Sequence, residues 1–334
     1  MPDESTKGIG IRIALVATSL LLVIFGLIYS HFWVREPKIF DVTAKAAEKF
    51  SQKKRQVSGY VTTNTLLEIV NTLLDKPGGY LSNDKMPPTV LLDNIPSWEY
   101  GVIVQIRDFS KALRNDISRS QTQSQEIKSL ALAENKFNID HKSWLFPRCE
   151  SEYRKGAKAL EQYMTAFSDP TKAETQFFTR ADNLRDWLKL VANRLGNFSQ
   201  RLSASVGQKR INTDLAGEPD AKTSTATNSE INAKTPWLQI DDVFFESRGA
   251  CWALIHLLKA IEYDFDDVLK KKNAKRSLQQ IIRELESTQL RTFSPVVLNG
   301  NNFGIFANYS LVMSSYIARA NAGIIELRDL LSQG

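Results

Sequence analysis

Cysteine and histidine are scarce in this chain of 334 residues, which holds two cysteines and three histidines. Cys149 and Cys251 lie about a hundred residues apart and form neither a Cys-x-x-Cys pair nor a disulfide framework. This scarcity excludes a zinc-stabilised fold, because structural zinc takes its ligands mainly from these two residue types. Both cysteines have apolar or aromatic neighbours, so we expect free buried thiols, with one bridge as the alternative in an oxidising compartment.

The motifs of several enzyme classes are absent as well. Neither His141 nor His256 stands three residues after a glutamate, the spacing that a di-iron helical bundle requires. The chain has no Gly-x-Ser-x-Gly, His-Glu-x-x-His or Walker motif. Catalysis by Cys149 or Cys251 with a histidine has no support in the spacing. We therefore predict no catalytic residue, no cofactor and no metal site.

Charge of neither sign dominates the sequence. There are 43 basic and 37 acidic residues, which gives a net charge of +6. An excess this small is typical of a soluble surface, so we expect no nucleic-acid partner. A weaker reading places the domain in the cytoplasm, with its basic excess on nucleic acid or anionic lipid.

One long apolar run is present, near the amino terminus. Residues 13–29 carry no charged side chain, and the uncharged stretch continues through Trp33. About twenty helical residues span the ~30 Å hydrocarbon core, and Tyr29 and Trp33 stand where an interfacial aromatic belt is expected. Bulky Phe32 and Val34 occupy the place of the small residues of a signal-peptide cleavage site. We predict an uncleaved, single-pass anchor over residues 1–34 that contacts the membrane through residues 9–33.

The orientation of this anchor follows from two conflicting signals. Basic residues number two before the apolar run, Lys7 and Arg12, and four between residues 35 and 49, which favours a cytoplasmic domain. Long domains, however, translocate largely regardless of charge, and a short tail before an apolar run is typical of signal-anchors that hold a domain outside. We predict that the soluble domain is periplasmic.

Residues 35–334 are predicted to form an all-α domain. Apolar residues recur there at spacings of three and four, without sustained alternation. We expect a transmembrane helix followed by a bundle of about eight helices, among them helices over 43–56 and 61–74 and one long stretch from 97 to about 130. The clearest pattern approaches a heptad seam, which requires a partner helix. Its residues are Leu184, Leu188, Val191, Leu195, Phe198, Leu202 and Val206.

Residues 207–236 interrupt this domain. They are rich in Ser, Thr, Asn, Lys and Asp, include Pro219 and Pro236, and lack aromatic residues. Such a segment buries too little apolar surface to offset the entropy of ordering it. We predict a flexible linker there.

Three groups of polar residues are candidates for a site. Glu262, Asp264, Asp266 and Asp267 form an acidic cluster, but Lys270 and Lys271 follow one helical turn later, which is typical of a solvated charged face. The string RADNLRDWL at 180–188 predicts register-fixing or surface pairing, with a ligand groove as the alternative. The glycine-rich NGNNFG at 299–304 lacks a preceding strand and a lysine, so it indicates a turn before a helix.

An enzyme that uses carboxylates and arginine is the alternative function. Its candidate residues are Glu150, Glu152, Arg180 and Asp182. Such an enzyme requires a pocket in which these groups converge.

Several strings resemble a known family. They include FFTRADNLRDWL (177–188), FSQRLSASVG (198–207), TPWLQIDDVFFESRG (235–249) and NGNNFG (299–304). Over nearly its whole length the chain resembles the proteobacterial domain-of-unknown-function family numbered 2333, whose members are membrane-anchored. The resemblance implies an anchored envelope protein and assigns no catalytic residue. We predict a non-enzymatic scaffold or interaction protein of the bacterial inner membrane, with a protein partner in the envelope.

Overall fold

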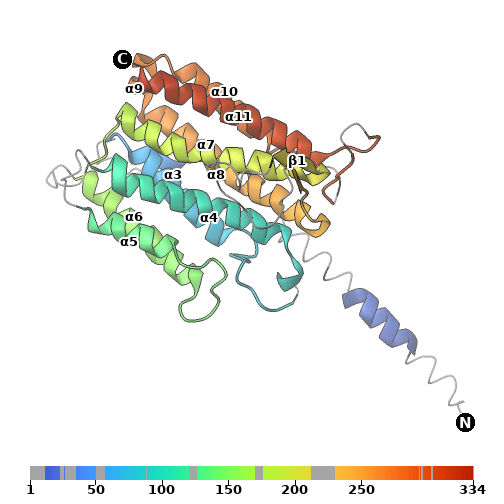
Figure 1. Cartoon of the computed structure of the whole chain (residues 1–334). Coiled ribbons are helices and arrows are strands. Elements are labelled where there is room, and N and C mark those ends of the chain that lie inside the picture. Colours follow the sequence, from blue (N-terminus) through green and yellow to red (C-terminus); the bar gives the residue numbers. More distant parts are fainter. Residues whose placement is uncertain are drawn as a thin grey trace, which may run out of the picture.

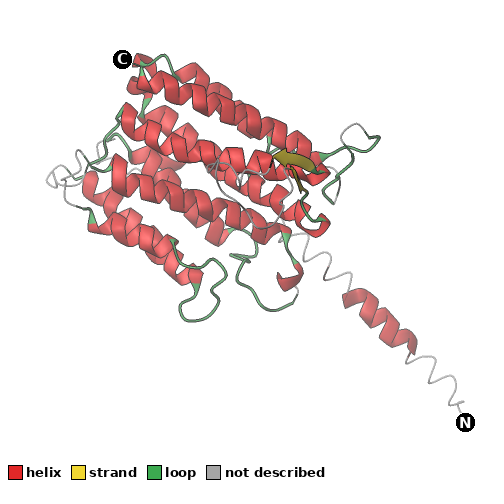
Figure 2. Cartoon of the chain, viewed as in Figure 1, coloured by secondary structure: helices red, strands yellow, loops and turns green. Residues whose placement is uncertain are grey.

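The structure is a computed structural model that describes most of the chain. The described residues are 12–22, 26, 35–49, 57–87, 89–119, 126–169, 176–211, 230–292, 294, 296–301 and 304–333. Nearly all the regular structure among them is helical, and one small pair of strands is present (Figure 2). The predicted all-α class is therefore confirmed.

The main helices run alternately up and down one bundle (Figure 1). Their bounds are α2 Val42–Lys49, α3 Tyr60–Asp75, α4 Asn94–Ala112, α5 Lys128–Phe137, α6 Cys149–Phe167, α7 Ala181–Ser203, α8 Ile240–Asp264, α9 Asp266–Lys271, α10 Lys275–Ser287 and α11 Tyr309–Ser332. Short 3-10 helices are η1 Thr89–Leu91, η3 Ala204–Val206 and η5 Trp237–Gln239, and η2 Leu113–Ile117 is a π-helical turn.

The long helix expected from 97 to about 130 is divided in two, which corrects that prediction. It ends in the π-helical turn at Ile117, and a separate helix, α5, begins at Lys128. The polar middle of the stretch offers few apolar side chains to bury, whereas Leu130 and Phe137 of α5 are buried. The structure therefore has more helices than the eight expected.

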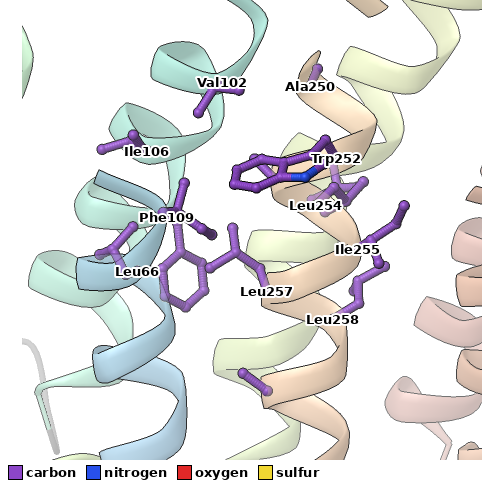
Figure 3. Packing of buried hydrophobic residues seen from close by; sticks show 14 of the residues in the cluster. Leu66, Val102, Ile106, Phe109, Ala250, Trp252, Leu254, Ile255, Leu257 and Leu258 are labelled. Atoms are coloured by element: carbon purple, nitrogen blue, oxygen red, sulfur yellow. The ribbon is translucent and has the colours of Figure 1, made fainter. Parts of the chain in front are cut away.

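Helix α8 lies at the centre of the bundle, and its middle part, residues 247–258, is buried on every side. Figure 3 shows Trp252 and Leu257 directed toward α4, while Ile255 and Leu258 lie on the opposite side of α8. The rings of Trp98 and Trp252 pack at 5.2 Å between centroids. All of these side chains are buried.

Glycine allows the backbones of α4 and α8 to touch. A Cβ atom at Gly249 would lie 2.0 Å from the carbonyl oxygen of Trp98, and one at Gly101 would lie 2.0 Å from that of Glu246. No side chain fits at either distance. These two positions therefore set the close approach of the central helices.

The predicted seam on α7 is buried, except that Val206, in η3, is half-buried. Its main partner is α11, which lies beside α7 along the bundle (Figure 1). The two helices are also linked by Ser314, whose hydroxyl donates to the carbonyl oxygen of Ser199 at 2.8 Å. The requirement for a partner helix is confirmed.

The two ends of the predicted linker, 207–236, are paired strands, which corrects the prediction there. Strand β1, Gln208–Ile211, pairs antiparallel with β2, Glu230–Ala233. Hydrogen bonding between two strands satisfies the backbone without a buried face, and composition does not reveal such pairing. Residues 212–229, the middle of the predicted linker, lie outside the described residues.

The described residues 12–22 form a helix that extends away from the bundle (Figure 1). Its apolar side chains face solvent, for example Val16 at 69% and Leu20 at 60% exposed. The part of the chain that the structure describes holds no helix both long and apolar enough to cross a membrane. Apart from Gly26, the rest of the predicted anchor lies outside the described residues.

Candidate functional site

The four residues of the carboxylate–arginine alternative do not come together. Glu150 and Glu152 lie in the first turn of α6, at the end of the bundle from which the N-terminal helix extends, whereas α7 begins at the opposite end (Figure 1). Asp182 and Arg180 stand at that start of α7. The described structure therefore shows no convergent pocket for these groups.

Each of these residues instead has a local partner. Glu152 accepts from Lys136 and from Lys155, and Glu150 accepts from Arg148 at 2.9 Å. Arg180 pairs with Asp182 at 2.6 Å on the surface.

The string at 180–188 combines surface pairing with one buried amide. Beside the Arg180–Asp182 pair, Arg185 contacts Asp186 at 3.3 Å. Asn183 is buried and donates to the carbonyl oxygen of Phe178 at 3.3 Å, which fixes the start of α7. The predicted pairing is confirmed.

Two of the acidic residues between 262 and 267 make contacts that stabilise the bundle. Asp266 pairs with Lys270 one turn later and with Lys275, each at 2.5 Å. Asp264 accepts from the backbone N–H of Thr62 at 2.7 Å and so holds the start of α3. Burial raises the pKa of the Asp264 carboxyl, and the hydrogen bonds from Thr62 oppose that rise. Among the described residues, no three His, Cys, Asp or Glu side chains come together as metal ligands would.

Both cysteines are free and buried, as expected from their neighbours. Burial raises the pKa of Cys149 and of Cys251 to about 12, so both remain thiols rather than nucleophilic thiolates at neutral pH. Cys149 Sγ lies 3.4 Å from the carbonyl oxygen of His141, not from its imidazole. The geometry gives cysteine–histidine catalysis no basis.

The glycine-rich string 299–304 leads into α11. Asn308 caps that helix: its side-chain oxygen accepts from the N–H of Leu311 at 2.9 Å, and its amide donates to the carbonyl oxygen of Gly300 at 2.7 Å. The predicted turn before a helix is confirmed for the described residues of this loop.

A different constellation joins the amino-terminal segment to the core. Residues 35–41, here called the strap, run along α8 without regular structure. Arg248 on α8 is buried, and its Nε lies 2.6 Å from a carboxylate oxygen of Glu36. The same guanidinium donates to the carbonyl oxygens of Thr288, Gln289 and Leu290, at 2.7, 3.1 and 2.9 Å.

His256 makes the second contact with the strap. The backbone N–H of Phe40 donates to His256 Nε2 at 3.0 Å, and the two rings stack at 3.9 Å. Nδ1 lies 2.7 Å from the carbonyl oxygen of Trp252, so it carries the hydrogen and Nε2 is the acceptor. Burial lowers the pKa of His256 to about 4, which keeps the ring neutral as this pattern requires.

The spacing of these two contacts has a simple geometric basis. The strap advances four residues from Glu36 to Phe40, which is ~13 Å in an extended chain. Helix α8 advances eight residues from Arg248 to His256, which is ~12 Å. The two lengths match, so an extended strap can meet both side chains at once.

Sequence reasoning did not find the strap. One signal was available: Arg248 directly precedes the apolar run GACWALI at 249–255, and a buried guanidinium requires a carboxylate partner. The identity of that partner, 212 residues away in the chain, is not visible in periodicity.

Comparison with known proteins adds one finding. Residues 4–334 match the model of a family described as "Uncharacterized protein conserved in bacteria (DUF2333)". No curated protein and no solved structure matches the chain.

Proposed function

The chain belongs to the DUF2333 family of bacterial proteins, and on that premise we propose that it is a non-enzymatic scaffold or interaction protein anchored in the inner membrane by its N-terminal helix. The carrying observation is the exposure of the apolar side chains of that helix, such as Leu15, Val16 and Leu20. Transfer of one such side chain out of water contributes about 1.5–3 kcal/mol, so a bilayer is the environment that stabilises this helix.

The strap supports the scaffold part of the proposal. Because Arg248 and His256 hold residues 36–40 against α8, the polypeptide that leaves the anchor is fixed to the core within a few residues. The proposed anchor is therefore followed directly by a segment that the core holds. This arrangement suits a protein that presents its surface to a partner protein in the envelope.

The proposed location of the bundle is the periplasm, on the basis of the short tail that precedes the apolar run. The carboxylate–arginine enzyme is disfavoured because Glu150 and Asp182 lie at opposite ends of the bundle.

Carbonate extraction of cell membranes tests the anchor. The full-length chain is expected to remain in the membrane pellet, and Val16→Arg with Leu20→Arg is expected to release it, since two charges at the centre of an apolar helix oppose insertion. Leu132→Arg, at an exposed apolar position on α5, is the matched control and should leave the protein in the pellet. Complete extraction of the unaltered chain would refute the anchor.

A reporter fusion after Gly334 tests the orientation separately. Alkaline phosphatase at that position is expected to be active, because it folds only outside the cytoplasm. An inactive phosphatase together with a fluorescent cytoplasmic reporter would place the bundle inside.

A further inference from the structure

Four loops lie at the end of the bundle from which the N-terminal helix extends (Figure 1). They are the described parts of the connections from α3 to α4 (between residues 76 and 93), from α5 to α6 (138–148), from α7 to α8 (204–211 and 230–239) and from α10 to α11 (between 288 and 308). The strap begins at the same end, because Glu36 shares Arg248 with the carbonyl oxygen of Leu290.

The tips of these loops carry large apolar side chains in water-exposed positions. In the loop 138–148, Phe146 is 93% exposed, and Trp144 and Leu145 beside it are also exposed. In the loop 288–308, Ile305 is fully exposed at 100% and Phe306 is exposed at 75%.

The other two loops repeat the pattern. Trp237 and Leu238 in η5 are 79% and 76% exposed, and Ile211 at the end of β1 is exposed as well. Met86, in the loop 76–93, is 75% exposed. We call these apolar loop tips, with Phe146, Trp237 and Ile305 as their most prominent members, the apolar end.

Large apolar side chains exposed on the helices of the described bundle are fewer and scattered. Leu132, Tyr263, Val312 and Ile325 are 44%, 46%, 53% and 46% exposed and lie on α5, α8 and α11. Single exposed residues of this kind are ordinary, whereas a group on four neighbouring loops marks an interaction surface.

The loops of the apolar end are fixed at their bases by hydrogen bonds. Asn83 donates to the carbonyl oxygen of Ser143 at 3.1 Å, which joins the loop 76–93 to the loop 138–148. Ser143 Oγ donates to the carbonyl oxygen of Pro147 at 2.7 Å and shapes the loop that carries Phe146. The Thr235 hydroxyl lies 3.2 Å from the carbonyl oxygen of Arg201 and ties the segment before Trp237 to α7. These hydrogen bonds hold the bases of the loops, while the apolar tips face outward.

We propose that the apolar end rests in the interfacial layer of the same bilayer that holds the N-terminal helix. This inference depends on the proposed anchor, because the anchor brings a membrane to this end and to no other. Trp and Phe at the tips are the side chains that membrane interfaces prefer.

Charge supports a lipid surface as the occupant. The exposed basic side chains of these loops outnumber the exposed acidic ones: Lys85, Lys142, Lys209, Lys234 and Arg291 stand against Asp93, Asp140 and Glu230. A basic excess of this kind favours binding to an anionic lipid surface. Three kinds of contact would then hold the bundle against the membrane: the inserted helix, the strap and the loop tips.

Site-directed spin labelling of the full-length chain in vesicles of phosphatidylcholine and phosphatidylglycerol tests this inference. Cys149 and Cys251 are buried, so a nitroxide reagent reacts at an introduced cysteine, and the unaltered chain gives the background. Labels at Phe146→Cys, Trp237→Cys and Ile305→Cys report on the apolar end. Ile325→Cys, on α11 near its far end, is the aqueous control, and Val16→Cys reports on the anchor.

The measured quantity is the ratio of collisions with oxygen, which concentrates in lipid, to collisions with a nickel chelate, which stays in water. We expect this ratio to be severalfold higher at the three loop tips than at Ile325→Cys, and highest at Val16→Cys. Loop labels as accessible to nickel as Ile325→Cys, with Val16→Cys in lipid, would overturn the inference and leave the anchor intact. A water-exposed Val16→Cys would overturn the anchor and the inference together.

Two further outcomes show whether lipid or protein covers the apolar end. Loop labels shielded from both reagents would show that a protein surface, such as a second copy of the chain, covers the apolar end, and would overturn the lipid assignment. Ile305→Asp with Phe306→Asp should lower the ratio at Trp237→Cys, whereas Ile325→Asp should not. An unchanged ratio in the first variant would also count against the inference.

Discussion

Lys76 and Glu99 form an ion pair of 2.6 Å in which both side chains are completely buried. The carboxylate of Glu99 also accepts from the backbone N–H of Leu81 at 2.9 Å and from that of Ser82 at 2.7 Å. Burial raises the pKa of Glu99, and the charge of Lys76 opposes the rise. The pair fastens the loop after α3 to the first turns of α4, at the base of the apolar end.

Removal of one partner of this pair should be costly. Lys76→Met leaves the Glu99 carboxylate buried without its cation, so the free energy of unfolding should fall by about 3–5 kcal/mol in urea denaturation at pH 7. The loss should shrink as the pH is lowered, because Glu99 then takes up a proton. The double variant Lys76→Met with Glu99→Leu should recover part of the stability, and equal losses in the single and double variants would show that the uncompensated charge is not the cause.

Replacement by alanine should have opposite effects on stability at Gly249, in the contact between α4 and α8, and at Gly196 on α7. Gly249→Ala places a Cβ against the Trp98 carbonyl oxygen and should lower the free energy of unfolding by about 3 kcal/mol or more. At Gly196, on α7, a Cβ would meet Asn321 at 3.5 Å, an ordinary contact. Gly196→Ala should therefore stabilise the bundle by up to about 1 kcal/mol through helix propensity. Thermal melts of both variants check this, and similar stability of the two would contradict it.

The neutral state of His256 predicts a loss of stability in mild acid. Its pKa is about 4 in the folded protein, against 6.5 as the ordinary value. The unfolded chain therefore binds a proton below pH 6.5 that the folded chain does not bind until about pH 4. Above that pH range the neutral ring costs no stability. Between pH 7 and pH 5 the free energy of unfolding should fall by about 2 kcal/mol because of His256.

His256→Gln checks that prediction, because the glutamine oxygen can still accept from Phe40 without titrating. Unfolding in urea at pH 7 and pH 5 should show a weaker pH dependence in this variant. Part of the dependence should remain, since burial also lowers the pKa of His141 to about 4. An equally strong pH dependence in His256→Gln would show that groups other than His256 cause the loss of stability in acid.

Limited trypsin digestion should cut first between Lys209 and Lys234, which are both exposed near the base of the β1–β2 pair. The two products should stay together on gel filtration, because α7 precedes the cut and α11 follows it, and these helices pack along their length. Separation of the products without denaturant would show two independent domains.

The sequence could predict the features that follow from the local spacing of apolar residues. The spacing of Leu184, Leu188 and Leu195 predicted the buried face of α7. Periodicity shows that a face is buried but not what covers it, so α11 could not be named as the partner. The division between α4 and α5 was missed for a related reason, since the polar residues between them fit a solvated helix as well as a break.

The site depended on contacts between distant parts of the chain. Glu36 and Arg248 are 212 residues apart, and a buried ion pair is set by three-dimensional packing rather than by local propensity. The same is true of Gly249, whose role appears only when the Trp98 carbonyl of another helix lies against it. The apolar end is a third case, because its side chains come from four loops that only the bundle brings together.

The strap runs in the same direction as α8, with Glu36 at Arg248 and Phe40 at His256. Tension applied to the strap from its N-terminal end therefore acts along the helix axis and loads both contacts together in shear, instead of breaking them one after the other. The helix that takes this load is held on several sides by the core. A pull on the N-terminal segment is thus passed to the buried central helix before any outer helix is strained.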